Sequence, residues 1–214
     1  MKMLPESLPV IENKQNIAIL GGAFNPVTKG HIQIAEYLLK TLKNLSEVWI
    51  MPCYSHVYHK KLVSPEHRLE MCRLAIGPRT DIMLFDYETK KQFSMGTYYL
   101  LVDLLNEDFI KKQFRIHMII GMDNANTFHY WIQHKKLMDL IPFITLPRRG
   151  IEAVPEIDWY KKPPHVFLDS KEAIMEVSST EVRALIKEQD YESAGKLVHP
   201  EVLEYIRMHQ LYAG

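Results

Sequence analysis

Cysteine, an excess of charge and long apolar runs are all scarce in this sequence, and each scarcity excludes a class of protein. Only Cys53 and Cys72 occur among 214 residues, so no disulfide framework is predicted. Lys plus Arg and Asp plus Glu balance at 26 each, which leaves no overall positive field to recruit nucleic acid. No apolar stretch is long enough to span a bilayer, and residues 1–16 lack the apolar core of a signal peptide. We therefore expect a cytoplasmic protein that binds neither nucleic acid nor membrane.

Three familiar catalytic or phosphate-binding signatures are also missing. No glycine-containing segment ends in the Gly-Lys-Ser/Thr of a P-loop, and the glycines do not form the dinucleotide fingerprint of dehydrogenases. The chain has no Ser-His-Asp or comparable pattern for an activated nucleophile. Any phosphate chemistry must therefore use another kind of loop.

Such a loop follows the first apolar run. Residues 21–31 read GGAFNPVTKGH, directly after residues 17–20 and directly before a helical pattern. Taken singly, each part of this loop is more often structural, but together they bring flexible backbone, a hydroxyl and an imidazole to a helix N-terminus, where an anion is favoured. We predict a phosphate site there. The residues that carry the prediction are Gly21, Gly22, Thr28, Gly30 and His31.

Short apolar runs alternate with amphipathic patterns, which favours parallel βαβ units. We expect an α/β fold, a Rossmann-like doubly wound parallel sheet, in one domain over residues 16–214 after an N-terminal extension of residues 1–15. A helical tail is expected at about residues 178–212, and a long surface loop at residues 150–164. The predicted strands are Ile17–Leu20, Glu47–Met51, Ile82–Phe85, Ile116–Ile120, Phe143–Leu146 and Val166–Leu168. The predicted helices begin near His31, Ser64-Pro65, Thr97, Ser178 and His199-Pro200.

A second motif lies at the start of the helical tail, where residues 177–183 read VSSTEVR. A capping box formed by Ser178 and Glu181 explains part of it without a ligand. Two further hydroxyls, those of Ser179 and Thr180, and the guanidinium of Arg183 remain unexplained. Free N–H groups, hydroxyls and an Arg fork can together bind the far phosphates of a nucleotide.

A third motif, GMDNANTFHYW, follows the predicted strand at residues 116–120. Asp123 is expected at the carboxyl edge of the sheet, where ligands of such folds bind, unless it caps the next turn. Trp131 can stack on a flat ring, or it can anchor a helix in the core.

The segment YHKKLVSPEHR at residues 58–68 supplies a basic side chain, Lys60, near the same sheet edge, although an exposed basic loop is the more usual explanation of adjacent lysines. Cys53, His56 and His59 have ligand-like spacing, with His67 as the remaining candidate ligand. A zinc site is the less favoured interpretation, because no clear fourth ligand accompanies the three.

Together these segments resemble the nicotinate/nicotinamide mononucleotide adenylyltransferases of the nucleotidyltransferase superfamily with an H/T-x-G-H motif. GGAFNPVTKGH matches the first signature of the family and VSSTEVR the second. The resemblance spans about residues 17–212 and departs from many bacterial members at Asn25, where they have Asp, and at Thr28, where they have His. The other similar segments are HKKLVSPEHRLEMCRLAI, QFSMGTYYL, GMDNANTFHYW, LPRRG and LVHPEVLEYIRMHQLY.

The resemblance implies transfer of AMP from ATP, with Mg²⁺ on the triphosphate, to the 5′-phosphate of a pyridine mononucleotide. The products are deamido-NAD or NAD and pyrophosphate. A phosphate monoester is largely dianionic at neutral pH, since its second pKa is about 6, so the nucleophile needs no general base. Catalysis is then a matter of positioning and charge neutralisation.

The resemblance also implies roles for individual residues. The expected catalytic residues are His31, Thr28 and Lys60. The residues expected to bind ATP are Gly21, Gly22, Phe24, Gly30, His31, Ser178, Ser179, Thr180 and Arg183. The residues expected to bind the acceptor are Asn25, Ser94, Thr97, Gly121, Asp123 and Trp131. No protein ligand set for a metal is expected.

Other functions remain open at this point. The acceptor of an adenylyltransferase could be phosphopantetheine, although its aliphatic arm has little use for a stacking Trp131. Cytidylyltransferases share the first motif and typically carry a different second one. A sensor that binds ATP or NAD without turnover is the alternative from another class. The choice between the nicotinate and nicotinamide forms stays open, and a homo-oligomer is a further expectation.

Overall fold

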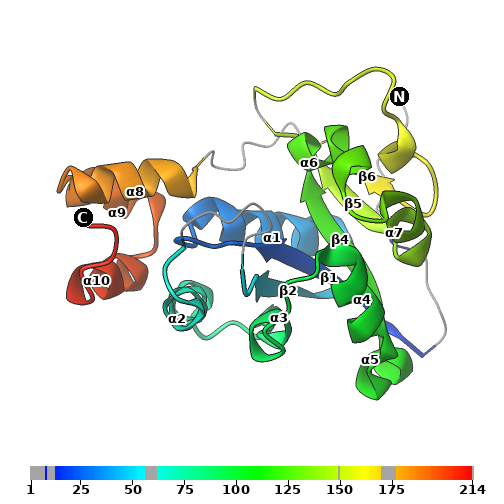
Figure 1. Cartoon of the computed structure of the whole chain (residues 1–214), viewed down its shortest axis with the longest axis horizontal. Helices are drawn as coiled ribbons and strands as arrows, with labels where there is room; N and C mark the ends of the chain where they lie inside the picture. The colour runs from blue at the N-terminus through cyan, green and yellow to red at the C-terminus, as the bar shows by residue number, and fades with distance from the viewer. Residues whose placement is uncertain (1–7, 9–12, 56–61, 149, 170–176, 214) are drawn as a thin grey trace. The chain divides into compact units, whose positions relative to one another are not determined.

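A computed structural model of the chain describes residues 8, 13–55, 62–148, 150–169 and 177–213 (Figure 1). Its parallel sheet has six strands in the order β3-β2-β1-β4-β5-β6. This order is that of the doubly wound Rossmann-like folds, so the predicted fold class is confirmed. The strands are β1 (Gln15–Gly22), β2 (Leu45–Pro52), β3 (Ile82–Leu84), β4 (Phe114–Gly121), β5 (Phe143–Leu146) and β6 (Val166–Phe167).

The central strands β1 and β4 are near-continuous apolar runs, as expected for strands buried on both faces. The two strands pair in parallel, with Ile17 opposite Ile116. Residues 17–20 of β1 and 116–120 of β4 are buried. One polar pair interrupts the apolar interior: Nε2 of His117 lies 3.1 Å from Oδ1 of Asn16. Both residues are buried. Burial disfavours the charged form of the imidazole and lowers the pKa of His117 to about 4.

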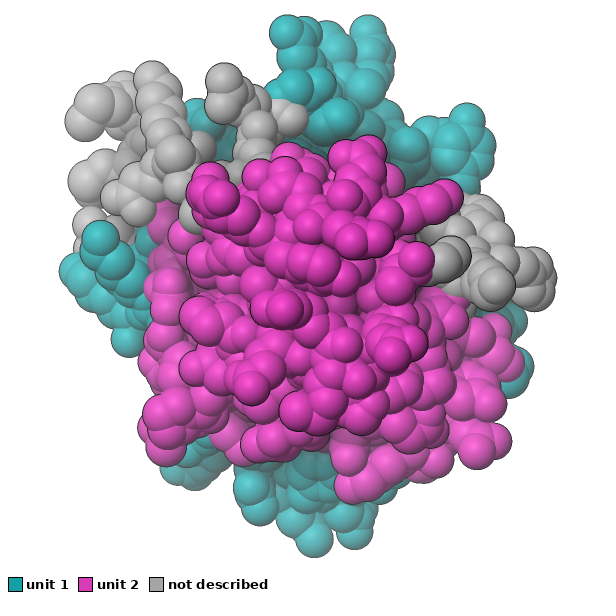
Figure 2. All heavy atoms as spheres, turned by 90° about the vertical axis from the view of Figure 1, so that its left-hand side faces the viewer, with its two compact units in different colours: residues 1–21, 38–49, 95–172 teal, residues 22–37, 50–94, 173–214 magenta. Residues whose placement is uncertain are grey.

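The chain forms two compact units, coloured separately in Figure 2. The first unit comprises residues 1–21, 38–49 and 95–172, and the second comprises residues 22–37, 50–94 and 173–214. The expectation of one domain over residues 16–214 stays a prediction.

The segment expected as a surface loop, residues 150–164, lies in the first unit. In the expected surface loop, residues 151–156 are exposed, but Tyr160 is fully buried and packs against Phe167. The expectation of a surface loop through residue 164 was therefore wrong at Tyr160. A Tyr in a Pro-rich segment does not by itself indicate burial.

The helices of the first unit are short. They are α4 (Thr97–Asn106), α5 (Asp108–Gln113), α6 (Met122–Asn126), η1 (Phe128–Tyr130), α7 (His134–Leu140) and η2 (Trp159–Lys161).

Helix α2 (Pro65–Ile76) of the second unit begins where its predicted cap places it. It has Pro65 in its first turn and ends at Gly77, whose φ of +63° suits glycine. Helix α3 (Tyr87–Lys90) is short. Helix α1 (Lys29–Thr41) begins in this unit, two residues before the expected His31.

The predicted helical tail is present as α8 (Ser179–Lys187), α9 (Tyr191–Leu197) and α10 (Pro200–Met208). Oγ of Ser178 accepts a hydrogen bond from the N–H of Glu181 at 3.0 Å, so the Ser178 half of the predicted capping box is confirmed. Nζ of Lys29 donates to the carbonyls of Gly195 and Lys196 at the end of α9, where a cation is favoured. Among the residues that the structure describes, no helix is long and apolar enough to cross a membrane.

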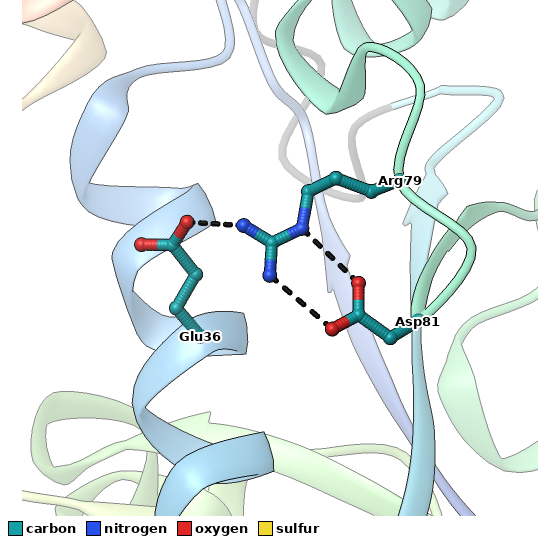
Figure 3. A network of polar contacts seen from close by, with 3 residues as sticks. All are labelled: Glu36, Arg79 and Asp81. Atoms are coloured by element: carbon teal, nitrogen blue, oxygen red, sulfur yellow. Dashed lines mark hydrogen bonds and ion pairs between the residues drawn. The ribbon is translucent and has the colours of Figure 1, made fainter.

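An ion-pair network also ties α1 into the second unit (Figure 3). The guanidinium of Arg79 donates through Nε and Nη2 to the two carboxylate oxygens of Asp81, and through Nη1 to Glu36 on α1. Its donation to Asp81 holds the pKa of that carboxyl below its usual range. The helix that carries His31 is therefore braced by polar contacts as well as by its apolar face.

Candidate functional site

The loop between β1 and α1 is tightly packed at Phe24. The φ of Phe24 is +44°, in the left-handed region that residues other than glycine rarely adopt. Phe24 is 2% exposed. A Cβ added to Gly22 would lie 3.3 Å from the Phe24 ring, so the glycine leaves room for the aromatic side chain. The ring meets the imidazole of His31 edge-on, with the centroids 5.0 Å apart. Phe24 thus packs against the imidazole and restricts its orientation.

The tautomer of the neutral His31 imidazole follows from its contacts with Thr28. The backbone N–H of Thr28 donates to Nδ1 of His31 at 3.0 Å, which requires a lone pair on that nitrogen. The Thr28 hydroxyl lies 2.8 Å from the same nitrogen, and Thr28 is only 1% exposed. The neutral imidazole therefore carries its proton on Nε2 and can act as a hydrogen-bond donor there.

The structure brings the two signatures together within the second unit. Oγ of Ser179 donates to the carbonyl of Pro26 at 2.8 Å, and Nη1 of Arg183 donates to the carbonyl of Asn25 at 2.8 Å. Nη2 of Arg183 donates to the Thr180 hydroxyl at 3.1 Å. The first two turns of α8 are thus hydrogen-bonded to the backbone of the β1–α1 loop across more than 150 residues of sequence.

Asn25 is the point where several segments meet. It is 4% exposed, and its Oδ1 accepts hydrogen bonds from the N–H of Val63 and the hydroxyl of Tyr212. These two bonds fill both lone pairs of the amide oxygen. The expected role of Asn25 in acceptor binding stays a prediction, and its observed contacts are structural.

A buried arginine is hydrogen-bonded to the loop between β1 and α1. Arg68 on α2 is fully buried and donates to the backbone carbonyls of Ala23, Tyr54 and Val63 at 3.0–3.1 Å. A buried guanidinium is tolerated only when its donors are paired, and here three segments supply the acceptors. Sequence analysis did not single out Arg68. Its signal was a charged residue on the apolar face of a helix, in register with Met71, Cys72, Ala75 and Ile76.

Glu88 lies next to this arginine and was also missed. One of its carboxylate oxygens accepts a hydrogen bond from the N–H of Tyr54 at 3.2 Å. Burial raises the pKa of Glu88 to about 7, although the hydrogen bond from Tyr54 and the charge of Arg68 both oppose this. The short polar segment around it carries no periodic pattern that could have marked the site.

The residues expected at the acceptor lie mostly in the first unit. A Cβ on Gly121 would lie 2.5 Å from Oδ1 of Asp123, so this glycine makes room for the carboxylate. Oδ2 of Asp123 accepts a hydrogen bond from Nη1 of Arg148 at 2.6 Å. Thr97 is the first residue of α4 and is half-buried, whereas Ser94 is exposed in the second unit.

Trp131 is half-buried, with its ring centroid 5.2 Å from that of Phe128. Phe128 itself stacks on Trp159 at 4.3 Å, and it is 2% exposed. The core of this cluster is therefore Phe128, with Trp131 at its edge. The partial exposure of Trp131 disfavours the alternative in which it serves only as a core anchor.

Some predicted residues cannot be placed. Lys60, His56 and His59 lie outside the described residues. Of the other candidate zinc ligands, Cys53 accepts a hydrogen bond from Arg68, and Nδ1 of His67 lies 2.9 Å from the Tyr205 hydroxyl. Burial raises the pKa of the Cys53 thiol, which disfavours the thiolate that a metal needs.

Comparisons with known proteins agree with this geometry. The cytidylyltransferase-like family matches residues 19–185. A protein of Caldicellulosiruptor saccharolyticus, named "Probable nicotinate-nucleotide adenylyltransferase", is 32% identical over 205 residues, which is 92% of this chain and 98% of the relative. The structure of Plasmodium falciparum nicotinic acid mononucleotide adenylyltransferase complexed with NaAD has a TM-score of 0.79 at 26% identity, and the alignment covers 92% of this chain and 97% of that one. The same protein complexed with APC gives 0.77 at 25% identity, with the same coverage.

The family match contains both signatures, and the relative aligns along almost the whole chain. The chain therefore belongs to the cytidylyltransferase-like family and, within it, to the nicotinate-nucleotide adenylyltransferases, which are nucleotidyltransferase enzymes.

Proposed function

We propose that this chain transfers AMP from ATP to nicotinate mononucleotide, forming deamido-NAD and pyrophosphate. The observation that carries the proposal is the junction of the two signatures, in which Ser179 and Arg183 are hydrogen-bonded to the backbone of the loop that holds His31. The names of the relatives support the nicotinate form of the acceptor over the nicotinamide form.

In the proposed reaction a phosphate oxygen of the mononucleotide attacks the α-phosphorus of ATP, and the bond from that phosphorus to the bridging oxygen of pyrophosphate breaks. The nucleophile is already anionic, so the protein has no proton to remove. Nε2–H of His31 donates to the α/β-phosphate oxygens and stabilises the charge that grows there. Thr28 contributes by holding Nδ1, since its hydroxyl is buried against that nitrogen.

The β- and γ-phosphates are assigned to the first two turns of α8. Ser178 is the N-cap of α8, Ser179 and Thr180 lie in its first turn, and Arg183 begins the second turn. Their hydroxyls and the guanidinium are assigned to these phosphates, and Lys60 supplies a further positive charge. Glycines and an aromatic ring form the floor beneath the nucleotide: Gly21, Gly22, Phe24 and Gly30. Partial positive charge at the helix N-terminus adds to the attraction for phosphate.

Mg²⁺ is proposed to arrive with the triphosphate. Among the described residues, no group of three or more His, Cys, Asp or Glu side chains is arranged to hold an ion. A magnesium ion that keeps several waters and is bound through substrate phosphates fits this set of residues. When bound, the ion neutralises charge on the leaving pyrophosphate.

The acceptor is assigned to residues of the third motif. The Asp123 carboxylate is held by Arg148 and is available to a ribose or pyridine-side donor, and Trp131 offers a partly exposed aromatic face to the pyridine ring. Ser94, Thr97 and Gly121 are further residues assigned to the acceptor in our proposal. The expectations of a cytoplasmic location, a homo-oligomer and no contact with nucleic acid or membrane stay predictions.

A pyrophosphate-release assay with ATP and Mg²⁺ tests the proposal. Separate reactions contain nicotinate mononucleotide, nicotinamide mononucleotide, phosphopantetheine or no acceptor. We expect the highest kcat/KM with nicotinate mononucleotide. A preference for phosphopantetheine would overturn the acceptor assignment, and ATP binding without release under any condition would identify a nucleotide sensor.

A further inference from the structure

The hydroxyl of Tyr212, close to the end of the chain, reaches the nucleotide loop. It donates to Oδ1 of Asn25 at 2.9 Å, across 187 residues of sequence. Burial raises the pKa of this phenol well above its usual range, so the hydroxyl stays protonated and remains a donor at every physiological pH.

The backbone after α10 is shaped to deliver this side chain. Gln210 has a φ of +51°, and the N–H groups of Gln210 and Leu211 donate to the carbonyls of Arg207 and Ile206. This is the pattern of a Schellman motif, with Leu211 buried as its apolar residue. Tyr212 follows with a φ of +66°, a conformation that costs free energy for a side chain of this size. Such a conformation persists only where contacts compensate for it.

Asn25 is hydrogen-bonded to both Tyr212 and Arg183. Its side-chain oxygen is held by Tyr212 and by the N–H of Val63, and its backbone carbonyl accepts from Nη1 of Arg183. The guanidinium has a second fixed contact, with Thr180. The Asn25 carbonyl is therefore one of two contacts that hold the Arg183 guanidinium, and it is the one that connects Arg183 to Tyr212.

We propose that Tyr212 is a positioning residue of the nucleotide site: its hydroxyl fixes Asn25, and the Asn25 carbonyl in turn holds the Arg183 guanidinium for the distal phosphates of ATP. The inference rests on the proposed function, because it assigns Arg183 to those phosphates. A tyrosine that only packed the tail would instead affect stability and leave the affinity for ATP unchanged.

Tyr205 provides a matched control. It lies on α10 in the same tail, and its hydroxyl is hydrogen-bonded to Nδ1 of His67 at 2.9 Å rather than to the nucleotide loop. Tyr212→Phe and Tyr205→Phe each remove one hydroxyl and keep the ring. A comparison of the two variants separates the contact with Asn25 from a general loosening of the tail.

The test measures the Kd of the full-length enzyme for ATP with Mg²⁺ by calorimetry, together with the KM for each substrate. Loss of one hydrogen bond to a buried acceptor predicts an ATP Kd roughly 3- to 10-fold higher for Tyr212→Phe. We expect the ATP Kd and the two KM values of Tyr205→Phe to change less than about twofold. An unchanged ATP Kd in Tyr212→Phe, or an equal rise of the ATP Kd in Tyr205→Phe, would overturn the inference.

Two further variants keep the test decisive. Asn25→Ala removes the same side-chain contact and should raise the ATP Kd as well; an unchanged value overturns the inference even if Tyr212→Phe does not fold. Arg183→Gln should weaken ATP binding strongly, and adding Tyr212→Phe to it should cause no further loss. If Arg183→Gln binds ATP normally, the phosphate assignment of the proposed function fails and the inference fails with it. If only Tyr212→Phe is without effect, the inference alone fails.

Discussion

The backbone N–H of Thr28 donates to Nδ1 of His31 across 3.0 Å, so the imidazole proton is on Nε2. The proposed catalytic donor is thus defined by a contact three residues away in the sequence. A donor held in this way needs little reorganisation when charge develops on a phosphate oxygen.

His31→Ala should lower kcat/KM by about 100-fold, the usual cost of losing a donor to the transition state. Thr28→Val removes the hydroxyl but keeps the backbone N–H, so we expect a loss of only about fivefold. Steady-state pyrophosphate release measures both. A His31→Ala enzyme within about threefold of the wild type would contradict the assigned role.

Trp131→Ala should raise the KM for the mononucleotide by about tenfold and change the KM for ATP little, because stacking on a ring contributes about 1 kcal/mol or somewhat more. The same assay, run with each substrate varied in turn, gives both constants. Equal increases for the two substrates would indicate that Trp131 acts only by supporting the Phe128 cluster.

Arg68→Gln should reduce the free energy of unfolding by about 2–5 kcal/mol, because buried carbonyls lose their donors. Arg73→Gln on the same helix is the matched control. Arg73 is exposed and pairs with Glu70, so its loss should leave the free energy of unfolding nearly unchanged. Urea denaturation measures both, and similar losses for the two variants would contradict a supporting role for Arg68.

Glu88 should make the protein less stable as the pH rises from about 4.5 to about 7. Its pKa is raised to about 7 in the folded protein, so the folded state binds the proton more tightly than the unfolded state does in this window. Glu88→Gln keeps an acceptor for Tyr54 and removes the titration, and should gain up to a few kcal/mol over the wild type between pH 5 and pH 8. A constant difference across this range would contradict the raised pKa.

His117 should have the opposite effect in acid. Its pKa is lowered to about 4 in the folded state, so between about pH 6.5 and pH 4 the unfolded state binds more protons and stability falls as the pH falls. His117→Gln should flatten this part of the pH profile of unfolding, at some cost in stability at pH 7. A profile as steep as that of the wild type would show that another group titrates there.

Local pattern predicted the fold well, and its failures have a common cause. The alternation of apolar runs and helical faces predicted the strands of the doubly wound sheet, and Ser64, Pro65 and Gly77 predicted the limits of α2. Tyr160 was missed because its burial depends on partners that become neighbours only after folding, such as Phe167.

The sequence by itself determined the fold class, the family and the two signatures, because these depend on spacings within a few turns of helix or strand. The tertiary structure decided which atoms of those signatures are already engaged. Asn25, expected at the acceptor, is held by Val63, Arg183 and Tyr212, and Arg68 supports the loop through three carbonyls. The hydrogen bonds of Asn25 with Val63 and Tyr212 join residues 38 and 187 positions apart. Contacts at such separations follow no periodic pattern, so only the folded chain reveals them.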